Sequence, residues 1–301
     1  MAPSRTHPAG SVTVRALLLA GMLAASMALP ACSWLVSDEA DTSHYPLIDL
    51  TPPEAARLHR ERENAVRTLE AVVKTTFESP ERGRDSAQAD LWVRRPDAFR
   101  MRAFARFVGG IFDLLIRKDR IWFYNLQEDT LYARRVGPPP EGEGRGASGD
   151  GEGEEAKAPD LEALFHTTGL ASLILGTSHD QIDYRYIDTG PNGVRLAMIN
   201  PSGLVEGYVW LEPKAFFKVR QVILGRGGRR ELDLRFGVFH EHEESGVWWP
   251  DCMEITAPRR HFRLTMRFDV EGMRLNEPLE ADVFVMDVPE DVKRIGDGPD
   301  K

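Results

Sequence analysis

The feature that most constrains the fold is a two-residue period of apolar and polar side chains, which recurs in short runs along most of the chain. In the run 99–106 one set of alternate positions is apolar and the other is mostly basic: Phe99, Met101, Ala103 and Ala105 against Arg100, Arg102, Phe104 and Arg106. Successive side chains of a β-strand point to opposite faces of a sheet, so this alternation predicts a strand with one buried face.

Similar runs, separated by turn-forming residues, follow at 111–117, 121–125, 131–135, 181–187, 194–199, 205–211, 216–224, 230–239, 252–256 and 262–270. Short turns require antiparallel neighbours. We therefore expect an α+β protein that is mainly β, with a strongly bent antiparallel open β-barrel of about 11 strands. Its apolar concave face must be covered, and a lid of two or three helices is available to cover it.

Two stretches have helical spacing. In 51–77 (TPPEAARLHRERENAVRTLEAVVKTTF), Thr51 is a candidate N-cap, Pro52 occupies the first helical position and Glu54 completes a capping box. Apolar residues then recur at helical spacing, at Leu58, Ala65, Leu69, Val72 and Val73. The stretch 159–176 (PDLEALFHTTGLASLILG) has a second apolar side, which a glycine divides into two pieces. These are the helices that we expect to cover the sheet.

The N-terminus carries an export signal. Arg5 and Arg15 precede an uncharged apolar segment of 13 residues at 16–28. This length is typical of a signal-peptide core and is shorter than the roughly 17 to 25 residues that span a bilayer. We therefore assign residues 1–31 to a lipoprotein signal peptide and expect the rest of the chain to be exported.

The sequence LPAC, which ends at Cys32, resembles the bacterial lipobox apart from Pro30. The resemblance implies cleavage before Cys32 and attachment of lipid to its thiol, which anchors the mature chain in a membrane. An ordinary secretory signal with a spectator cysteine is the alternative. Ser33 is not an aspartate, which by proteobacterial sorting rules favours the periplasmic face of the outer membrane. The second cysteine, Cys252, is then expected to be a buried thiol without an intrachain partner.

Charge and composition argue against one class of partner and locate a disordered segment. The net charge is −9 without a basic block, which argues against a nucleic-acid partner. The segment 137–159 holds six acidic residues against two basic ones, so −4 of the −9 lies there. We expect this segment to be a disordered acidic insertion within a domain at 51–295, which a tether at 32–50 precedes and a tail at 296–301 follows.

Three motifs that could carry chemistry have simpler structural explanations. Asp188 lies in IDTGP, which contains the Asp-Thr-Gly of aspartic proteases, but its dense turn formers favour a hairpin turn. His240 and His242 could hold a metal with nearby acids, yet they lack the His-Glu-x-x-His spacing. The glycines of GRGGR at 225–229 open no helix and predict a hairpin turn. We therefore expect no enzymatic activity, no cofactor and no metal.

Several stretches resemble the family of the lipoprotein carriers LolA and LolB, in the same order along the chain. In NEPLEADVFVMDVPEDV (276–292) the matching positions are Asn276, Phe284, Val288, Pro289 and Val292. The stretches WLEPKAFFKVRQV (210–222), FRMRAFARFVGGIFDLLI (99–116) and LASLILG (170–176) are similar to a family hairpin, a strand-loop-strand and a short helix. The resemblance covers most of 51–292, with the acidic insertion as a departure. It implies an open barrel, lidded by helices, whose apolar cavity accepts acyl chains.

We therefore expect a lipid-anchored periplasmic protein that binds acyl chains or lipoproteins and acts in outer-membrane lipoprotein or lipid trafficking. The candidate cavity-lining residues are Phe99, Met101, Ala103, Trp122, Tyr124, Trp210 and Phe217. Phe107 and Val108 form an apolar tip, at the place where the LolB family projects an exposed aliphatic residue; they could contact a membrane or partner, or pack under the lid. Two alternatives stay open: an envelope sensor or scaffold whose own side chains fill the barrel, and a hydrolase that uses Asp188 or a His240 and His242 metal site.

Overall fold

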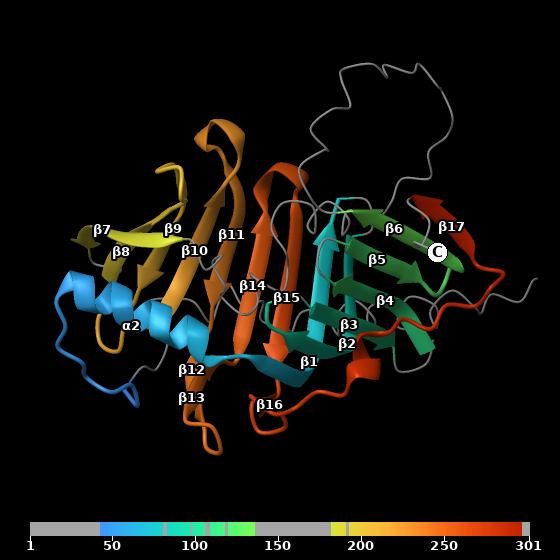
Figure 1. Ribbon diagram of the computed structural model, residues 1–301, viewed down its shortest axis with the longest axis horizontal. Helices are drawn as coiled ribbons and strands as arrows, with labels where there is room; N and C mark the ends of the chain where they lie inside the picture. Colours follow the sequence, from blue (N-terminus) through green and yellow to red (C-terminus); the bar gives the residue numbers. More distant parts are fainter. Residues whose placement is uncertain are drawn as a thin grey trace, which may run out of the picture.

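The computed structural model describes residues 43–80, 83–96, 98–105, 109–117, 120–135, 182–190 and 193–296. Figure 1 shows a large curved sheet with helix α2 (Pro52–Ala65) lying across one end of it. The described part of the chain contains this one α-helix and is otherwise mainly β. The predicted fold class, mainly β with an open and bent sheet, is confirmed.

The strands follow one another along the chain, mostly as hairpins. Their bounds are β1 (Thr68–Ser79), β2 (Gly83–Arg94), β3 (Ala98–Ala105), β4 (Gly109–Arg117), β5 (Arg120–Asn125), β6 (Thr130–Arg135), β7 (Asp183–Gly190), β8 (Gly193–Ile199), β9 (Val205–Leu211), β10 (Lys218–Leu224), β11 (Arg230–Phe236), β12 (Phe239–His242), β13 (Val247–Pro250), β14 (Cys252–Ala257), β15 (Phe262–Phe268), β16 (Arg274–Leu275) and β17 (Lys293–Gly296). Short 3-10 turns lie at η2 (Arg226–Gly228), η3 (Pro258–Arg260) and η4 (Ala281–Phe284). Turn η2 connects β10 to β11 within GRGGR, as the sequence predicted.

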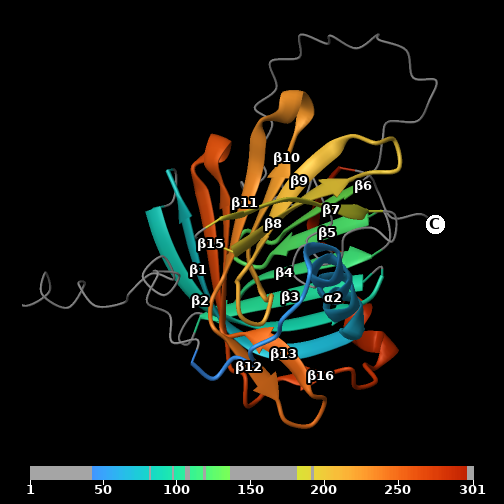
Figure 2. The same cartoon turned by 90° about the vertical axis from the view of Figure 1, so that its left-hand side faces the viewer.

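Fifteen of the described strands form one sheet, in the order β17-β6-β5-β4-β3-β2-β1-β15-β14-β11-β10-β9-β8-β7, with β16 paired to β1. Neighbours are antiparallel, except that β17 runs parallel to β6. Strands β12 and β13 form a separate two-stranded ribbon. Figure 2 shows the strong bend of the sheet, with α2 on its concave side. Because β17 and β7 are edges, the sheet is an open trough, and the predicted number of about 11 strands is too low.

Helix α2 is shorter than the sequence predicted. Its predicted capping box is present, since the carboxylate of Glu54 accepts a hydrogen bond from the backbone N–H of Thr51 at 2.8 Å. The helix nevertheless ends at Ala65 and β1 begins at Thr68, so the expectation of a helix through residue 77 is wrong. In β1 the alternate residues Leu69, Ala71, Val73 and Thr75 are buried. Its β-branched side chains fit a strand, and pairing with β2 and β15 selects the strand over the helix.

The side chain of Asn276 fixes this transition from helix to strand. Its Oδ1 accepts a hydrogen bond from the backbone N–H of Arg67 at 2.7 Å, and its Nδ2 donates to the carbonyl of Ala65 at 2.8 Å. The last carbonyls of a helix lack partners within the helix. Asn276, one of the residues that carry the family resemblance, therefore caps α2 from a segment far away in sequence.

The two faces of the sheet differ in chemistry. The inner face is apolar, and its buried side chains pack into the main core; they include Leu69, Leu91, Met101, Leu114, Leu211, Leu234 and Leu264. On the outer face charged side chains pair between neighbouring strands, as Arg220 does with Asp233 at 2.6 Å. This one-sided arrangement is the one that the two-residue period predicted.

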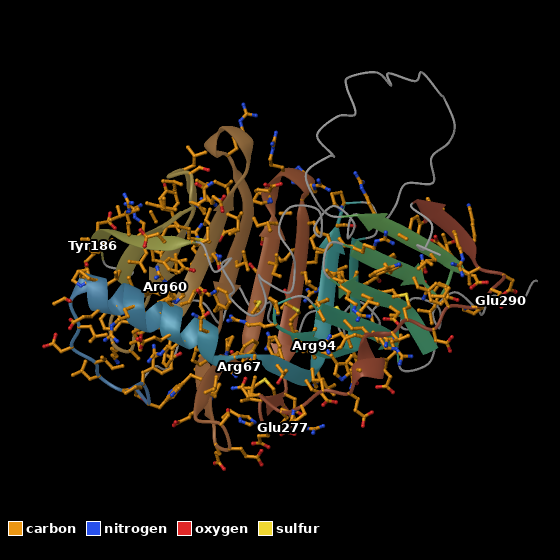
Figure 3. The ribbon with its side chains drawn as sticks, viewed as in Figure 1. Arg60, Arg67, Arg94, Tyr186, Glu277 and Glu290 are labelled. Carbon is orange, nitrogen blue, oxygen red and sulfur yellow. The ribbon has the colours of Figure 1, made fainter. Side chains whose placement is uncertain are left out.

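Residues 276–292, here called the strap, cross the outer face of the sheet toward β17, as Figure 1 shows in orange and red. Phe284 in the strap is buried against Ala98 and Leu115. The guanidinium of Arg94 lies 4.7 Å from the centre of the Phe284 ring, and Figure 3 shows Arg94 at this edge of the strands. The strap thus closes a second, smaller core on the outer side of the sheet.

The first described residues already pack on the domain. The hydroxyl of Tyr45 accepts a hydrogen bond from the backbone N–H of Phe239 at 2.7 Å, and the N–H of Ile48 donates to the carbonyl of Lys214 at 2.9 Å. The segment predicted as a tether, 32–50, therefore contacts the domain before its end.

Cys252 at the start of β14 is buried and disulfide-bonded. The expected burial of Cys252 is confirmed, whereas the expectation that it lacks a partner is wrong. Among the helices of the described residues, none has the length and apolarity needed to cross a membrane.

Candidate functional site

Four of the seven candidate cavity residues lie on the inner face. Phe99, Met101 and Ala103 on β3, and Phe217 just before β10, belong to the main core and are at most 2% exposed. Their side chains are covered by other side chains. They therefore form the wall of the inner face.

The other three candidates lie on the outer face. Trp122 and Tyr124 on β5 pack with side chains of the strap, whereas Ile121 and Phe123 of the same strand belong to the main core. Cζ of Arg220 lies 5.0 Å from the centre of the ring of Trp210 on β9. The expectation that Trp122, Tyr124 and Trp210 line the cavity thus assigned them to the wrong face.

Cys32, Phe107, Val108 and the predicted helix at 159–176 lie outside the described residues, as does the acidic insertion at 137–159. The lipid anchor, the apolar tip and the second lid helix therefore stay predictions.

Asp188 lies near the end of β7, beside the predicted hairpin to β8, in which Gly190 pairs with Gly193. The hairpin is confirmed, although Asp188 itself lies in the strand. Its carboxylate forms a two-point ion pair with Arg195, with Nε and Oδ1 3.1 Å apart, and its side chain is 52% exposed. An exposed and paired carboxylate lacks the buried, proton-sharing partner that aspartic proteases use.

His240 and His242 do not form a joint site. His242 is buried, and its ring nitrogens lie 2.8 Å from the carbonyl oxygen of Met273 and 3.0 Å from the hydroxyl of Ser245. His240 is exposed and stacks on His44, with ring centres 5.7 Å apart. Nowhere in the described ranges do three His, Cys, Asp or Glu side chains gather so that they could hold a metal.

A pocket of about 70 Å³ lies between α2 and the inner face of the sheet. Most of its wall is apolar: Phe216, Phe217, Phe236, Phe239, Trp248, Trp249, Val66, Pro250 and Met253. The remaining wall is charged or polar, with His59, Arg62 and Glu63 from α2 and Lys218 from β10. The pocket therefore combines an aromatic cage with a charged end.

Glu63 is the centre of a buried polar network beside the pocket. Its carboxylate accepts hydrogen bonds from Nζ of Lys218 at 3.1 Å and from the hydroxyl of Tyr184 on β7 at 2.8 Å. Nζ of Lys218 also donates to Gln221 at 3.0 Å. A buried ion pair is tolerated when the remaining hydrogen-bonding groups are also satisfied. The network connects α2 to β7 and β10 and fixes the helix over the sheet.

Burial sets the charge states within this network. Loss of hydration is the main reason why the pKa of His59 falls from 6.5 to about 4. The attraction of Glu63 raises the pKa but does not compensate, and the positive charges of Lys218, Arg62 and Arg60 lower it further. Burial alone would raise the pKa of Glu63, but His59, Lys218 and the hydroxyl of Tyr184 together hold it below its usual value. At neutral pH the imidazole is therefore neutral and the carboxylate is ionised.

The turn between β9 and β10 forms one side of the pocket. The carboxylate of Glu212 accepts hydrogen bonds from the backbone N–H groups of Lys214 at 2.8 Å and of Ala215, and the carbonyl of Ala215 accepts one from Arg62. Phe216 in this turn has φ of 57°. A bulky residue with positive φ is strained and persists only where its surroundings hold it in place. Phe216 is therefore a strained aromatic residue in the wall of the pocket.

Two buried polar atoms of the pocket wall have no hydrogen-bond partner. They are Nε2 of His59, whose side chain is 3% exposed, and Nε1 of Trp249, which is 4% exposed as a residue. Nε2 of His59 lies 3.4 Å from the carboxylate of Glu63 without forming a hydrogen bond. Buried polar groups are almost always paired, so an unpaired indole N–H in a pocket indicates a missing acceptor.

Sequence reasoning missed this pocket. His59, Arg62 and Glu63 lie in the charged run RLHRERE, which has the composition of a solvated helix face. The spacing of His59 and Glu63 at i and i+4 could have indicated the pocket, since residues at this spacing share one side of a helix.

No protein-family model and no curated protein matches the sequence. The fold is similar to that of solved structures at low identity. A DUF1329 family protein from Desulfovibrio piger has a TM-score of 0.49 at 11% identity, over 77% of this chain and 96% of that chain. A proposed outer membrane lipoprotein-sorting protein domain from Vibrio parahaemolyticus has a TM-score of 0.48 at 12% identity, over 78% and 97%. A LolA superfamily protein from Nitrosomonas europaea has a TM-score of 0.42 at 13% identity, over 79% and 99%.

Proposed function

We propose that this chain is a non-enzymatic, lipid-anchored protein of the bacterial cell envelope that binds acyl chains or lipoproteins on the concave side of its sheet. The observation that carries the proposal is the one-sided sheet, with an apolar inner face and an ion-paired outer face. An acyl chain that takes the place of the side chains covering this face would leave water for an apolar surface, which is favourable. The motifs that resemble LolA and LolB support the same function.

Lipid binding should be visible as lipid that copurifies with the protein. We expect native mass spectrometry after gentle purification to show lipid adducts. Ala103→Phe adds a ring to the buried inner face of β3, and in protein whose denaturation curve shows that it still folds it should reduce the adducts severalfold. Ser86→Phe adds the same ring to the exposed outer face of β2 and should leave them unchanged. Wild-type protein that carries no extractable lipid would contradict the proposal.

A self-filled scaffold is the second candidate, because one observation favours it. The pocket bounded by described residues measures about 70 Å³, whereas ligand pockets usually measure roughly 300–1,000 Å³. In this alternative the chain is an envelope sensor or scaffold, and its barrel holds its own side chains. The lipid extraction separates the two candidates, since a scaffold would come out free of lipid.

The lipid anchor at Cys32 is part of the proposal and has its own test. Cys32→Ala should abolish incorporation of labelled palmitate and release the protein from the membrane fraction, because the acyl chains hold it there. Cys252→Ala removes the other cysteine and should keep the label. The sequence has two cysteines, so a thioether at Cys32 and an intrachain disulfide of Cys252 exclude each other. After reduction, the anchored mature chain has one alkylatable thiol, whereas the disulfide-bonded chain has two. Palmitate incorporation that continues in Cys32→Ala, or two thiols in mature wild-type protein, would refute the anchor.

A further inference from the structure

Two neighbouring hairpins expose arginines that have no partner in the fold. The β10–β11 and β14–β15 hairpins reach the same end of the sheet, because β11 pairs with β14 and turn η3 contacts β11 (Figure 1). Their turns expose Arg229, Arg259 and Arg260, here called the arginine rim. None of these three side chains forms an ion pair or hydrogen bond with a residue that the structure describes. On the outer face, by contrast, Arg100 and Arg195 pair with aspartates.

The two turns do not need arginines for their geometry. Gly227 and Gly228 in η2 have φ of 75° and 69°, Pro258 begins η3, and His261 ends it with φ of 52°. Glycine and proline set such turns through their backbone conformations. Arginines gathered at one place repel one another, so the rim costs stability. In a chain of net charge −9, this concentration of positive charge favours an anionic partner.

The carboxylates around the rim do not cancel its charge. On the two hairpins and the flanking strands β9 and β1, three carboxylates at this end already lie within 4 Å of other arginines: Asp233 of Arg220 and Arg230, Glu78 of Arg84 and Arg263, and Glu254 of Arg263. Two more, Glu206 on β9 and Glu231 beside Gly225, have no ion pair with a described residue. The sequence adds Arg226 to the turn of Arg229, so positive charge stays in excess.

Exposed aliphatic side chains lie beside the rim. The turn between β8 and β9 is at the same end of the sheet as η2, since Gly207 near the start of β9 pairs with Ile223 near the end of β10. This turn and the first residue of β9 expose Leu204 by 65% and Val205 by 43%. Aliphatic side chains next to basic ones fit the boundary between headgroups and acyl chains of a bilayer. The combination favours a membrane over a soluble anion.

The opposite end of the sheet is acidic. The ribbon β12–β13 projects from that end, as Figure 1 shows, and its turn exposes Glu241, Glu243 and Glu244. An anionic surface attracts one end of such a molecule and repels the other. We propose that the arginine rim docks on a membrane that contains anionic phospholipids, with its guanidinium groups on the lipid phosphates and Leu204 and Val205 in the interface. This inference goes beyond acyl-chain binding on the concave side and does not depend on it.

Sedimentation of the full-length chain with vesicles tests the proposal. Every protein carries Cys32→Ala, so that no acyl chain anchors it. We expect vesicles of equal parts phosphatidylglycerol and phosphatidylcholine to bind it about a hundredfold more tightly than phosphatidylcholine alone, at roughly fivefold for each rim arginine. Replacing all three rim arginines by glutamine should remove most of this preference, and Arg259→Gln alone about fivefold of it.

A matched variant removes the same charge elsewhere. Arg57, Arg67 and Arg117 are also exposed but lie on α2, before β1 and at the end of β4. Glutamine at these three positions should leave most of the preference in place. High salt should abolish the preference, because it screens charges at the surface.

Four outcomes would overturn the proposal. They are equal binding to both kinds of vesicle, wild-type binding in the variant without rim arginines, an equal loss in the matched variant, and a preference that survives high salt. A fifth concerns the acidic segment 137–159 of the same chain. If binding to anionic vesicles appears only after its acidic residues are replaced by amides, the partner of the rim is that segment and the membrane assignment is wrong.

Discussion

Replacing Arg100 by leucine should lower the free energy of unfolding by about 3–5 kcal/mol, because it leaves a buried charge without its partner. Arg100 on β3 is buried and makes two parallel contacts with Asp113 on β4, Nε to Oδ1 at 3.0 Å and Nη2 to Oδ2 at 2.6 Å. Its Nη1 also donates to the strap carbonyls of Val283 at 2.6 Å and Val285 at 2.8 Å. The substitution would remove the two contacts to the carboxylate of Asp113 and the hydrogen bonds to the carbonyls of Val283 and Val285. Chemical denaturation followed by tryptophan fluorescence measures the loss.

Two matched variants test the cause of this loss. Arg102 lies 3.7 Å from the same carboxylate, but its side chain is 56% exposed. Arg102→Leu should therefore change the free energy of unfolding by less than about 1 kcal/mol. Leucine at both 100 and 113 should recover much of the loss, since an apolar pair can replace a buried ion pair. A loss below about 1 kcal/mol in Arg100→Leu would mean that the strap does not depend on this guanidinium.

The strands on which only one face is apolar were predicted best. Strand β9 lies at its predicted residues, 205–211. On these strands a register error would move the apolar set into water, so the pattern identifies the strand. The faces were harder to assign on β5, because the strap makes its outer side apolar too. Trp122 and Tyr124 were chosen for their size, whereas Ile121 and Phe123 occupy the inner face.

The segment after α2 shows why local pattern can mislead. Leu69, Val72 and Val73 fit helical spacing, while Leu69, Ala71 and Val73 fit a strand equally well. Pairing with β2 and β15 selects the strand. These partners lie elsewhere in the chain, and tertiary pairing routinely overrides local preference.

The pocket could not be predicted because its residues come from segments far apart in the sequence and form a pocket only in the folded protein. Figure 3 shows Arg60 on α2 and Tyr186 of β7 at the same end of the molecule, where Arg60 and Asp183 lie 3.3 Å apart. One turn further along α2, Glu63 meets Lys218 from a strand far away in sequence. In sequence both are ordinary surface residues. Only the crossing of α2 over β7 and β10 converts them into a buried pair.

Lowering the pH from 6.5 to 4 should reduce the free energy of unfolding by about 3 kcal/mol through His59 alone. The pKa of His59 is about 4 in the folded protein, against 6.5 for an ordinary histidine. Between pH 6.5 and 4, His59 is mostly protonated in the unfolded chain and mostly neutral in the folded chain, so acid favours unfolding. The loss begins as the pH approaches 6.5 and levels off below the folded pKa, where both states bind the proton. The carboxyl of Glu63, whose pKa is held below its usual value, adds a loss of the same sign at still lower pH.

The prediction is tested by the difference between variants, because other carboxylates also bind protons in acid. His59→Gln removes the titrating ring from the network of Glu63, Lys218 and Tyr184, so its stability should fall less steeply between pH 6.5 and 4 than that of the wild type. His240→Gln removes an exposed ring and should keep the wild-type slope. The measurement is a set of denaturant titrations at half-unit pH steps. Equal slopes for wild type and His59→Gln would show that His59 accepts a proton in the folded state, and hence that the pocket admits water or a counter-charge to stabilise it.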